Sequence, residues 1–269
     1  MNSMKQAAKQ IGLPFLNAFK YKEKKAIIDV FGKHTFNDLV KQSQLLSKHM
    51  LHVVCDKETI NPHNFKGENI AILCDNDHTY VNAQWATWML GATYVPLSNL
   101  HPLKELEHII NDCKPKLLVG TSNHSEILTK LKQNMDIDLL TFEPVLKDNN
   151  QIIYSGDKKT LPSSLISDNG LQSLWNEIDW STTSSHILYT SGTTGRPKGV
   201  VSSFSNLISQ VKDINEAWDV SCSDGYLHVL PLHHVHGIVN NLISPLMAGA
   251  LVTMLPKFNA EQVRFRFNP

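Results

Sequence analysis

Residues 189–199 read Tyr189-Thr190-Ser191-Gly192-Thr193-Thr194-Gly195-Arg196-Pro197-Lys198-Gly199. An apolar run, Ile187-Leu188-Tyr189, precedes this stretch, and a helix-like pattern follows from about Phe204. Glycines permit positive φ and close backbone approach, so successive N–H groups in such a loop can form a nest for an anion. The hydroxyl groups add donors, and a lysine adds positive charge for phosphate oxygens. The pattern predicts a phosphate-binding loop made by Thr190, Ser191, Gly192, Thr193, Thr194, Gly195 and Lys198.

The stretch differs from two common phosphate-binding patterns. A Walker A loop requires G-x-x-x-x-G-K-[ST], whereas Lys198 follows Gly195 by three positions and precedes Gly199. The G-x-G-x-x-G dinucleotide fingerprint is also absent. Loops rich in glycine and hydroxyl residues often bind nothing, so a plain surface loop remains an alternative at this point.

The whole string resembles the [YF]-T-S-G-[ST]-T-G-x-P-K-G signature of the adenylate-forming superfamily. That superfamily includes acyl-CoA synthetases, firefly luciferase and the adenylation domains of peptide synthetases. This chain matches the signature at every position. The resemblance implies that residues 190–195 and Lys198 wrap the β- and γ-phosphates of ATP.

Composition excludes several other classes of protein. The chain has 269 residues, which suffices for a sizeable core, and its formal net charge of zero gives no support to nucleic-acid binding. No apolar run approaches the length of a membrane span. The four cysteines form no C-x-x-C pair and fit no zinc signature; they are Cys55, Cys74, Cys113 and Cys222.

Strand-like and helix-like patterns alternate along the chain, which predicts an α/β fold with mostly parallel sheets flanked by helices. Strands are expected at 26–30, 69–74, 92–97, 116–119, 137–142, 226–230 and 251–255. Five segments are expected: a basic arm or degenerate targeting segment (1–25), a first α/β subdomain (26–142), a linker or surface excursion (143–184), a second α/β part with the phosphate loop (185–263) and an atypical tail (264–269).

Three histidines, His233, His234 and His236, crowd an expected strand-to-helix turn. A metal site is one reading, although no carboxylate or cysteine lies within the motif to complete a ligand set. Polar residues at the start of a helix are a second. A substrate wall is the third, because parallel sheets bind ligands at the carboxyl ends of their strands. The placement of both motifs at such ends favours the third reading.

The string Leu230-Pro231-Leu232-His233-His234-Val235-His236-Gly237 resembles the acyl-pocket motif of acyl-CoA synthetases, most closely that of the malonyl-CoA synthetases. The resemblance implies that a carboxylic acid attacks the α-phosphate of ATP, with Mg²⁺ bridging phosphates, and that CoA then takes up the acyl group. It places His234 at the acyl pocket. From its charge, His236 is expected to help hold a distal carboxylate such as that of malonate.

The resemblance covers roughly residues 14–263 and implies part of the large N-terminal domain of the adenylate-forming fold, without its C-terminal domain. The Tyr-Gly-x-Thr-Glu adenine string is not found in this sequence. Such a chain is expected not to complete the reaction alone. The alternatives are a non-catalytic fragment or isoform that binds nucleotide weakly, and a synthetase for another short or medium-chain acid. The resemblance implies a mitochondrial location, with the cytoplasm as the alternative.

Overall fold

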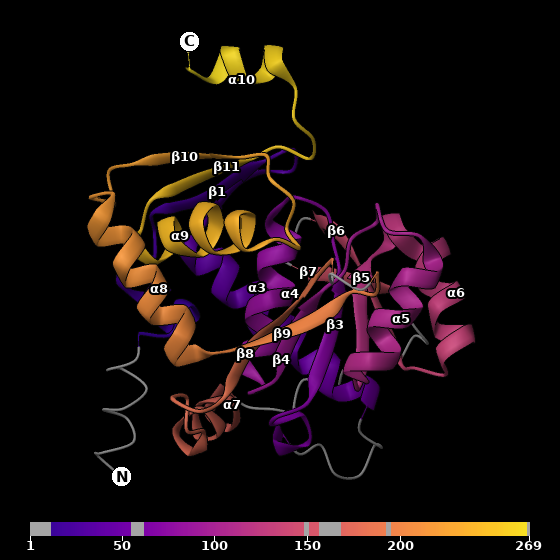
Figure 1. Ribbon diagram of the computed structural model, residues 1–269. Coiled ribbons are helices and arrows are strands. Elements are labelled where there is room, and N and C mark those ends of the chain that lie inside the picture. The colour runs from indigo at the N-terminus through magenta and orange to yellow at the C-terminus, as the bar shows by residue number, and fades with distance from the viewer. Residues whose placement is uncertain (1–11, 55–61, 148–150, 156–167, 192–194, 268–269) are drawn as a thin grey trace.

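The computed structural model describes residues 12–54, 62–147, 151–155, 168–191 and 195–267. Two sheets with helices packed between and around them form its body (Figure 1). The larger sheet has the strand order β7-β6-β5-β3-β4-β8-β9. Its strands are β3 (Asn69–Leu73), β4 (Thr93–Pro96), β5 (Leu117–Thr121), β6 (Leu139–Lys147), β7 (Gln151–Ser155), β8 (Ser184–Thr190) and β9 (Lys198–Ser203).

The smaller sheet has the order β10-β11-β1-β2 and joins chain segments that are far apart in sequence. Its strands are β1 (Lys25–Asp29), β2 (Gly32–Thr35), β10 (Gly225–His228) and β11 (Leu251–Met254). The inner strands of both sheets pair in parallel, while β2, β7 and β9 are antiparallel strands at the edges. The expectation of an α/β fold with mostly parallel sheets is therefore confirmed.

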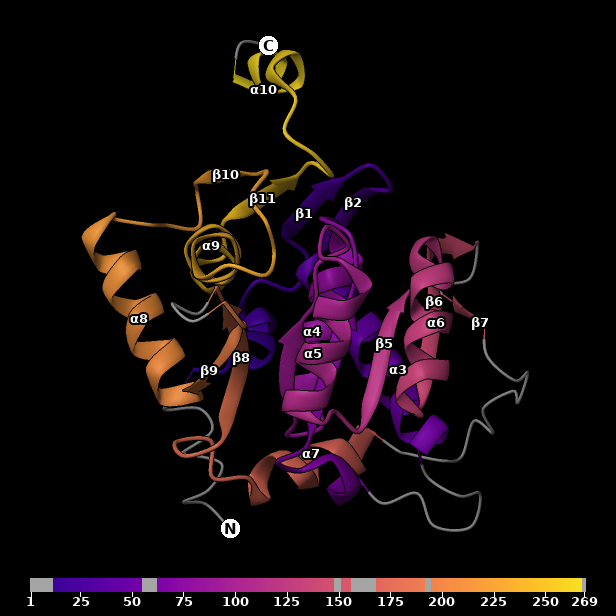
Figure 2. The ribbon, with the colours of Figure 1, turned by 45° about the vertical axis from the view of Figure 1, so that its right-hand side comes forward.

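The longer helices are α3 (Phe36–Val54), α4 (His78–Met89), α5 (Leu103–Cys113), α6 (Ser125–Met135), α7 (Asp168–Glu177), α8 (Phe204–Ala217) and α10 (Ala260–Phe267). Short helical elements are α2 (Pro14–Asn17), α9 (Ser244–Ala248), the 3₁₀ turns Ala18–Lys20, Pro62–Phe65 and Ser122–His124, and the π-helix His236–Ile243. Helix α10 stands away from the body in both ribbon views (Figures 1 and 2). Among the described helices, none combines the length and the apolar composition that a bilayer crossing requires.

Alternate side chains of β3 enter two different cores, as the period of a strand requires. Ile70 and Ile72 join the core that contains α3 and α4, whereas Ala71 and Leu73 join the core beneath α5 and α6. The continuous apolar run of β3 is therefore explained by burial on both faces. Helices α5 and α6 cover the second face of the larger sheet (Figure 1).

Residues 143–184, expected as a linker or surface excursion, carry regular structure over most of their described part, with turns at 178–183. They include the end of β6, all of β7 and α7. Trp175 of α7 is buried, packs against Phe15 with the rings tilted and their centroids 5.1 Å apart, and donates from Nε1 to the Met89 carbonyl at 2.7 Å. The sequence interpretation missed this helix because its flanks are polar, although Leu171, Leu174 and Trp175 recur at helical spacing.

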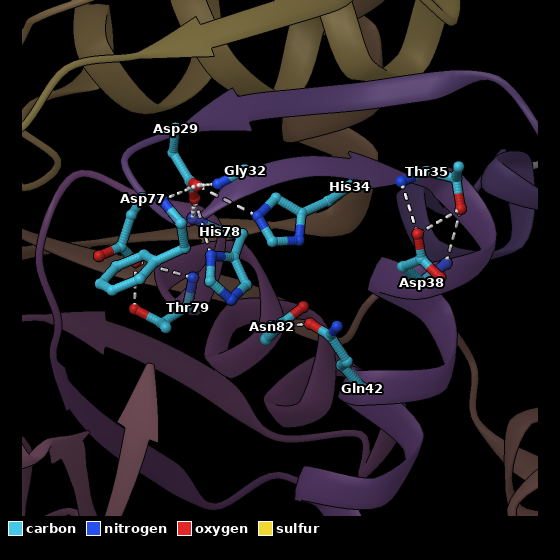
Figure 3. Close-up of polar contacts among 11 residues, drawn as sticks. Asp29, Gly32, His34, Thr35, Asp38, Gln42, Asp77, His78, Thr79 and Asn82 are labelled. Carbon is cyan, nitrogen blue, oxygen red and sulfur yellow. Dashed lines mark hydrogen bonds and ion pairs between the residues drawn. The ribbon is translucent and has the colours of Figure 1, made fainter. Parts of the chain in front are cut away.

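Every residue of α4 is buried, so its N-terminus needs polar partners inside the protein. Asp77 caps the helix by accepting from the Thr79 amide at 2.8 Å, as its sequence position predicts. Asp29, at the end of β1, accepts from the amide and Nδ1 of His78 at 2.9 and 2.7 Å. The same carboxylate thus ties the smaller sheet to the helix beneath the larger one (Figure 3).

Asp29 is the acceptor for three further donors. They are the amides of Phe31 and Gly32, at 2.8 and 3.1 Å, and His34 Nε2 at 3.1 Å. Burial alone would raise the pKa of Asp29, but the hydrogen bonds from His34 and His78 outweigh it and hold that pKa well below its usual range. Because five donors converge on one carboxylate whose side chain is fully buried, its ionised form is structural.

We expect Asp29→Ala to lower the free energy of unfolding by roughly 3–5 kcal/mol, because it leaves several buried donors unpaired. Urea unfolding measures the loss, with Asp213→Ala on the exposed surface of α8 as control. The pKa of Asp29 is lower in the folded state, so its contribution is complete above about pH 4 and declines as the pH falls. Near pH 3 the difference from wild type should shrink by roughly 1 kcal/mol. An equal loss in both variants would contradict this role.

Candidate nucleotide and carboxylate site

The phosphate-loop stretch joins β8 to β9 as an antiparallel hairpin, with Tyr189 opposite Gly199 and Thr190 opposite Lys198. The sequence suggested a strand, a loop and then a helix; the structure inserts β9 before α8. Val200 and Val201 of β9 are 51% and 59% exposed, so this edge strand lacks the alternation that would have revealed it. The loop is thus held at both ends by a ladder of backbone hydrogen bonds.

The described part of the loop presents its polar groups to solvent. Thr190, Ser191, Gly195 and Lys198 are all exposed, and Gly195 has φ of +90°, a region that favours glycine. The Lys198 side chain makes no hydrogen bond or ion pair with any residue that the structure describes, so its ammonium group is available to an anion. Gly192, Thr193 and Thr194, also expected to bind phosphate, lie outside the described residues.

Tyr189, the last buried residue before the loop, lies against the glycine opposite it. A Cβ atom on Gly199 would come within 2.8 Å of Ile187 Cγ2 and 3.0 Å of Tyr189 Cζ. The Tyr189 hydroxyl donates to Asp112 Oδ2 of α5 at 2.6 Å. Burial and the bond to Asp112 raise the pKa of Tyr189, so it stays a neutral donor. Gly199 is therefore required here for packing.

A second bond ties the returning strand to the same helix. His108 Nε2 lies 3.2 Å from the Pro197 carbonyl oxygen, which can only accept, so the imidazole donates. Pro197 immediately precedes Lys198 of the phosphate loop. Sequence reasoning did not single out His108 or Asp112, because neither belongs to a motif; their spacing of four on one helix face is the signal they carry.

The histidine turn, residues 231–237, follows β10 and leads into the π-helix. Tyr80 of α4 donates its hydroxyl to the Leu232 carbonyl at 2.8 Å, and Asn76 donates to the Leu230 carbonyl at 2.9 Å. Fully buried His228 donates from Nε2 to the Gly237 carbonyl at 3.0 Å. Burial lowers the pKa of His228 to about 4, so it is neutral near pH 7. The expected apolar helix after this turn begins as a π-helix, a form common at functional sites.

The three histidines of the turn differ in exposure. His234 and His236 are exposed, whereas His233 is half-buried. The His233 ring lies 4.1 Å from that of His234 and 4.9 Å from that of His101, measured between centroids. Burial, with His234 and His101 adding to it, lowers the pKa of His233 to about 4. His233 is therefore neutral near pH 7 and can act as a hydrogen-bond partner. His101, just after β4, is a member of this group that the sequence motifs missed.

Asp29, His34 and His78 bring three metal-ligating atoms within 4.8 Å of one another. Two features of the group oppose metal binding. The roughly four lone-pair sites of a carboxylate are already met by the five donors around Asp29. The two imidazole rings stack at 3.9 Å with an interplanar angle of 16°, so a metal between them would lie out of both ring planes. The cluster is a structural tie between the sheets (Figure 3).

Comparison with known proteins gives consistent results. Residues 15–267 match the family described as AMP-binding enzyme. The chain is 39% identical over 249 residues to the mitochondrial malonate–CoA ligase ACSF3 of Xenopus laevis and 34% over 253 residues to that of Homo sapiens. These alignments cover 93% and 94% of this chain and 40% of each relative. The chain thus spans about 40% of the length of these relatives.

A solved structure of ATP-bound MatB from Rhodopseudomonas palustris has the same fold over this region. Its TM-score is 0.70 at 23% sequence identity, and the match covers 93% of this chain and 46% of that one. At this identity the likeness establishes the fold alone. It agrees with the expectation that these residues correspond to part of a larger N-terminal domain.

We expect Gly237→Ala to destabilise the histidine turn, because the added Cβ would lie 2.3 Å from the Pro231 carbonyl oxygen. Overpacking against backbone costs about 1–3 kcal/mol, measurable as a shift in the urea midpoint. Gly225→Ala is the matched control, because nothing lies within 4 Å of a Cβ placed there. If the two substitutions cost the same, the close approach at Gly237 is not what fixes the turn.

Proposed function

The chain belongs to the family of AMP-binding enzymes, and we propose that it carries the ATP phosphate loop and the acid pocket of an acid–CoA ligase whose acid is malonate. In this reaction a carboxylate oxygen attacks the α-phosphorus of ATP and pyrophosphate leaves. The CoA sulfur then attacks the acyl carbon of the adenylate and AMP leaves. Because the chain spans about 40% of its relatives, this activity is proposed for the whole protein.

One observation carries the nucleotide half of the proposal: the hairpin after β8 holds Thr190, Ser191 and Lys198 exposed above a buried, hydrogen-bonded base. Hydroxyl groups and an ammonium group suit the oxygens of a triphosphate. Held in place before the substrate binds, they can neutralise charge on the leaving pyrophosphate without reorganising. Gly192, Thr193 and Thr194 complete the proposed loop.

The proposal includes Mg²⁺ and CoA because the proposed acid–CoA ligase reaction uses both. Mg²⁺ usually keeps several waters and binds through substrate phosphates with one or two protein oxygens. The exposed hydroxyls of Thr190 and Ser191 fit that limited role. When bound, Mg²⁺ would supply charge neutralisation at the phosphates. We assign no residue of the described part to CoA.

The acid half of the proposal rests on the histidine turn and on the relatives. The relatives are named malonate–CoA ligases, and malonate differs from simple acids by a second carboxylate. Exposed His234 and His236, beside neutral His233, offer several imidazole N–H donors for that group. The vertebrate relatives are named mitochondrial, and the proposal extends that compartment to this protein, with cell fractionation to distinguish it from the cytoplasm.

The test is acid-dependent exchange of labelled pyrophosphate into ATP by the whole protein, with malonate, acetate and octanoate compared at equal concentration. Malonate is expected to support the fastest exchange. Lys198→Ala should weaken ATP binding about tenfold or more, the effect of losing one charged contact, whereas Lys132→Ala on α6 should not. Titration calorimetry with Mg·ATP measures this separately from catalysis.

The outcomes separate the alternatives. ATP binding without exchange for any acid would favour a non-catalytic nucleotide-binding module. Exchange that prefers acetate or octanoate would keep the reaction and overturn the choice of malonate. Failure of wild type to bind ATP, or equal binding by wild type and Lys198→Ala, would overturn the phosphate-loop assignment.

A further inference from the structure

The phosphate-loop hairpin and the histidine turn belong to different sheets, yet one contacts helix α5 and the other contacts the short loop that enters α5. The hairpin follows β8 in the larger sheet, and the histidine turn follows β10 in the smaller sheet. Helix α5 and the residues just before it touch the hairpin through His108 and Asp112 and the turn through His101.

The contacting side chains form one polar stripe. Glu105, His108 and Asp112 have spacings of three and four, so they lie on one face of α5. His101 precedes α5 by two residues, and its Nδ1 lies 3.5 Å from Glu105 Oε1, which links the entering loop to the stripe.

The rest of α5 is anchored independently of this stripe. Leu106, Ile109, Ile110 and Cys113 are buried in the core beneath α5 and α6. The helix is therefore fixed to the sheet by apolar packing, and the stripe projects toward the two loops. A substitution in the stripe removes loop contacts without opening that core.

We propose that the α5 stripe, formed by His101, Glu105, His108 and Asp112, is a positioning element that holds the phosphate-loop hairpin and the histidine turn at a fixed separation. Its residues act through Pro197, Tyr189 and His233 and touch no substrate themselves. The consequence for catalysis rests on the proposed function: the triphosphate and the acid are presented to each other by α5 and the loop that enters it. Positioning of this kind accounts for a large share of enzymatic rate enhancement.

The structural part is tested without any ligand by amide hydrogen exchange. His108→Phe removes the donor to Pro197, and Asp112→Ala removes the acceptor for Tyr189. Each should speed exchange at Lys198–Val201 by about two- to tenfold, the range expected for one net hydrogen bond. His101→Leu should speed exchange within 232–238 instead. Asn111→Ala, an exposed neighbour on α5, should change neither segment.

Conservative variants separate positioning from general stability. His108→Gln keeps an N–H donor near the position of Nε2, and Asp112→Asn keeps an oxygen acceptor, so both should restore wild-type exchange. A uniform rise in exchange over the whole chain, or no rescue by these two variants, would overturn the proposal. Unchanged exchange in His108→Phe and Asp112→Ala would overturn it as well.

The functional part is measured as affinity for Mg·ATP. His108→Phe should bind about two- to tenfold more weakly than wild type, and His108→Gln should match wild type. If wild type fails to bind ATP, the proposed function fails, and the exchange data still decide the positioning role. If wild type binds and His108→Phe binds equally well, positioning by α5 does not reach the nucleotide and that part is overturned.

Discussion

Helix α4 sets the main constraint on this structure, because all twelve of its residues are buried. A helix covered on every side leaves the first backbone amides without water as a partner. Asp77, the N-cap residue, accepts a hydrogen bond from the Thr79 amide, and Asp29 of the smaller sheet accepts one from the His78 amide. Asp29 also accepts hydrogen bonds from the imidazoles of His34 and His78 and from the Phe31 amide in the β1–β2 turn. One carboxylate therefore fixes the position of the smaller sheet relative to the larger one. The position of the histidine turn depends on that junction, because β10 belongs to the smaller sheet.

The sequence revealed the elements whose burial follows a simple rule. The strand expected at 69–74 was predicted correctly as β3, and Asp77 and Thr35 stand directly before helices, where capping residues are typical; Thr35 and Asp38 exchange hydrogen bonds. Strand β9 was missed because its valines face outward on a sheet edge and the chain gives no alternation there. Helix α7 was missed although Leu171, Leu174 and Trp175 recur at helical spacing and are buried, because the many polar residues before and after them led the whole segment to be interpreted as a surface excursion.

The same distinction applies to the candidate site. The motifs named the loop residues and His234 and His236, because these carry donors or charge at the carboxyl ends of strands. They did not name His101, His108 or Asp112, whose importance lies in what they hold. A positioning residue needs only one contact of the right geometry, and its residue type alone does not reveal that contact in the sequence. The carboxyl-end rule would have found His101, which follows β4, had it been applied to every parallel strand.

A fixed separation between the two loops bears on how an acid would be selected. In the proposed reaction a carboxylate must reach the α-phosphorus while the other end of the acid contacts the histidine turn, so both the length of the acid and the position of its second charge would affect binding. Neither loop alone would distinguish acids by both of these properties. Neutral His233, pressed between His101 and His234, adds hydrogen-bonding capacity without fixed positive charge. Selectivity for a short dicarboxylic acid would then have two sources. One is the distance between the phosphate hairpin and the histidine turn, which the α5 stripe holds fixed, and the other is hydrogen bonding by the exposed imidazoles.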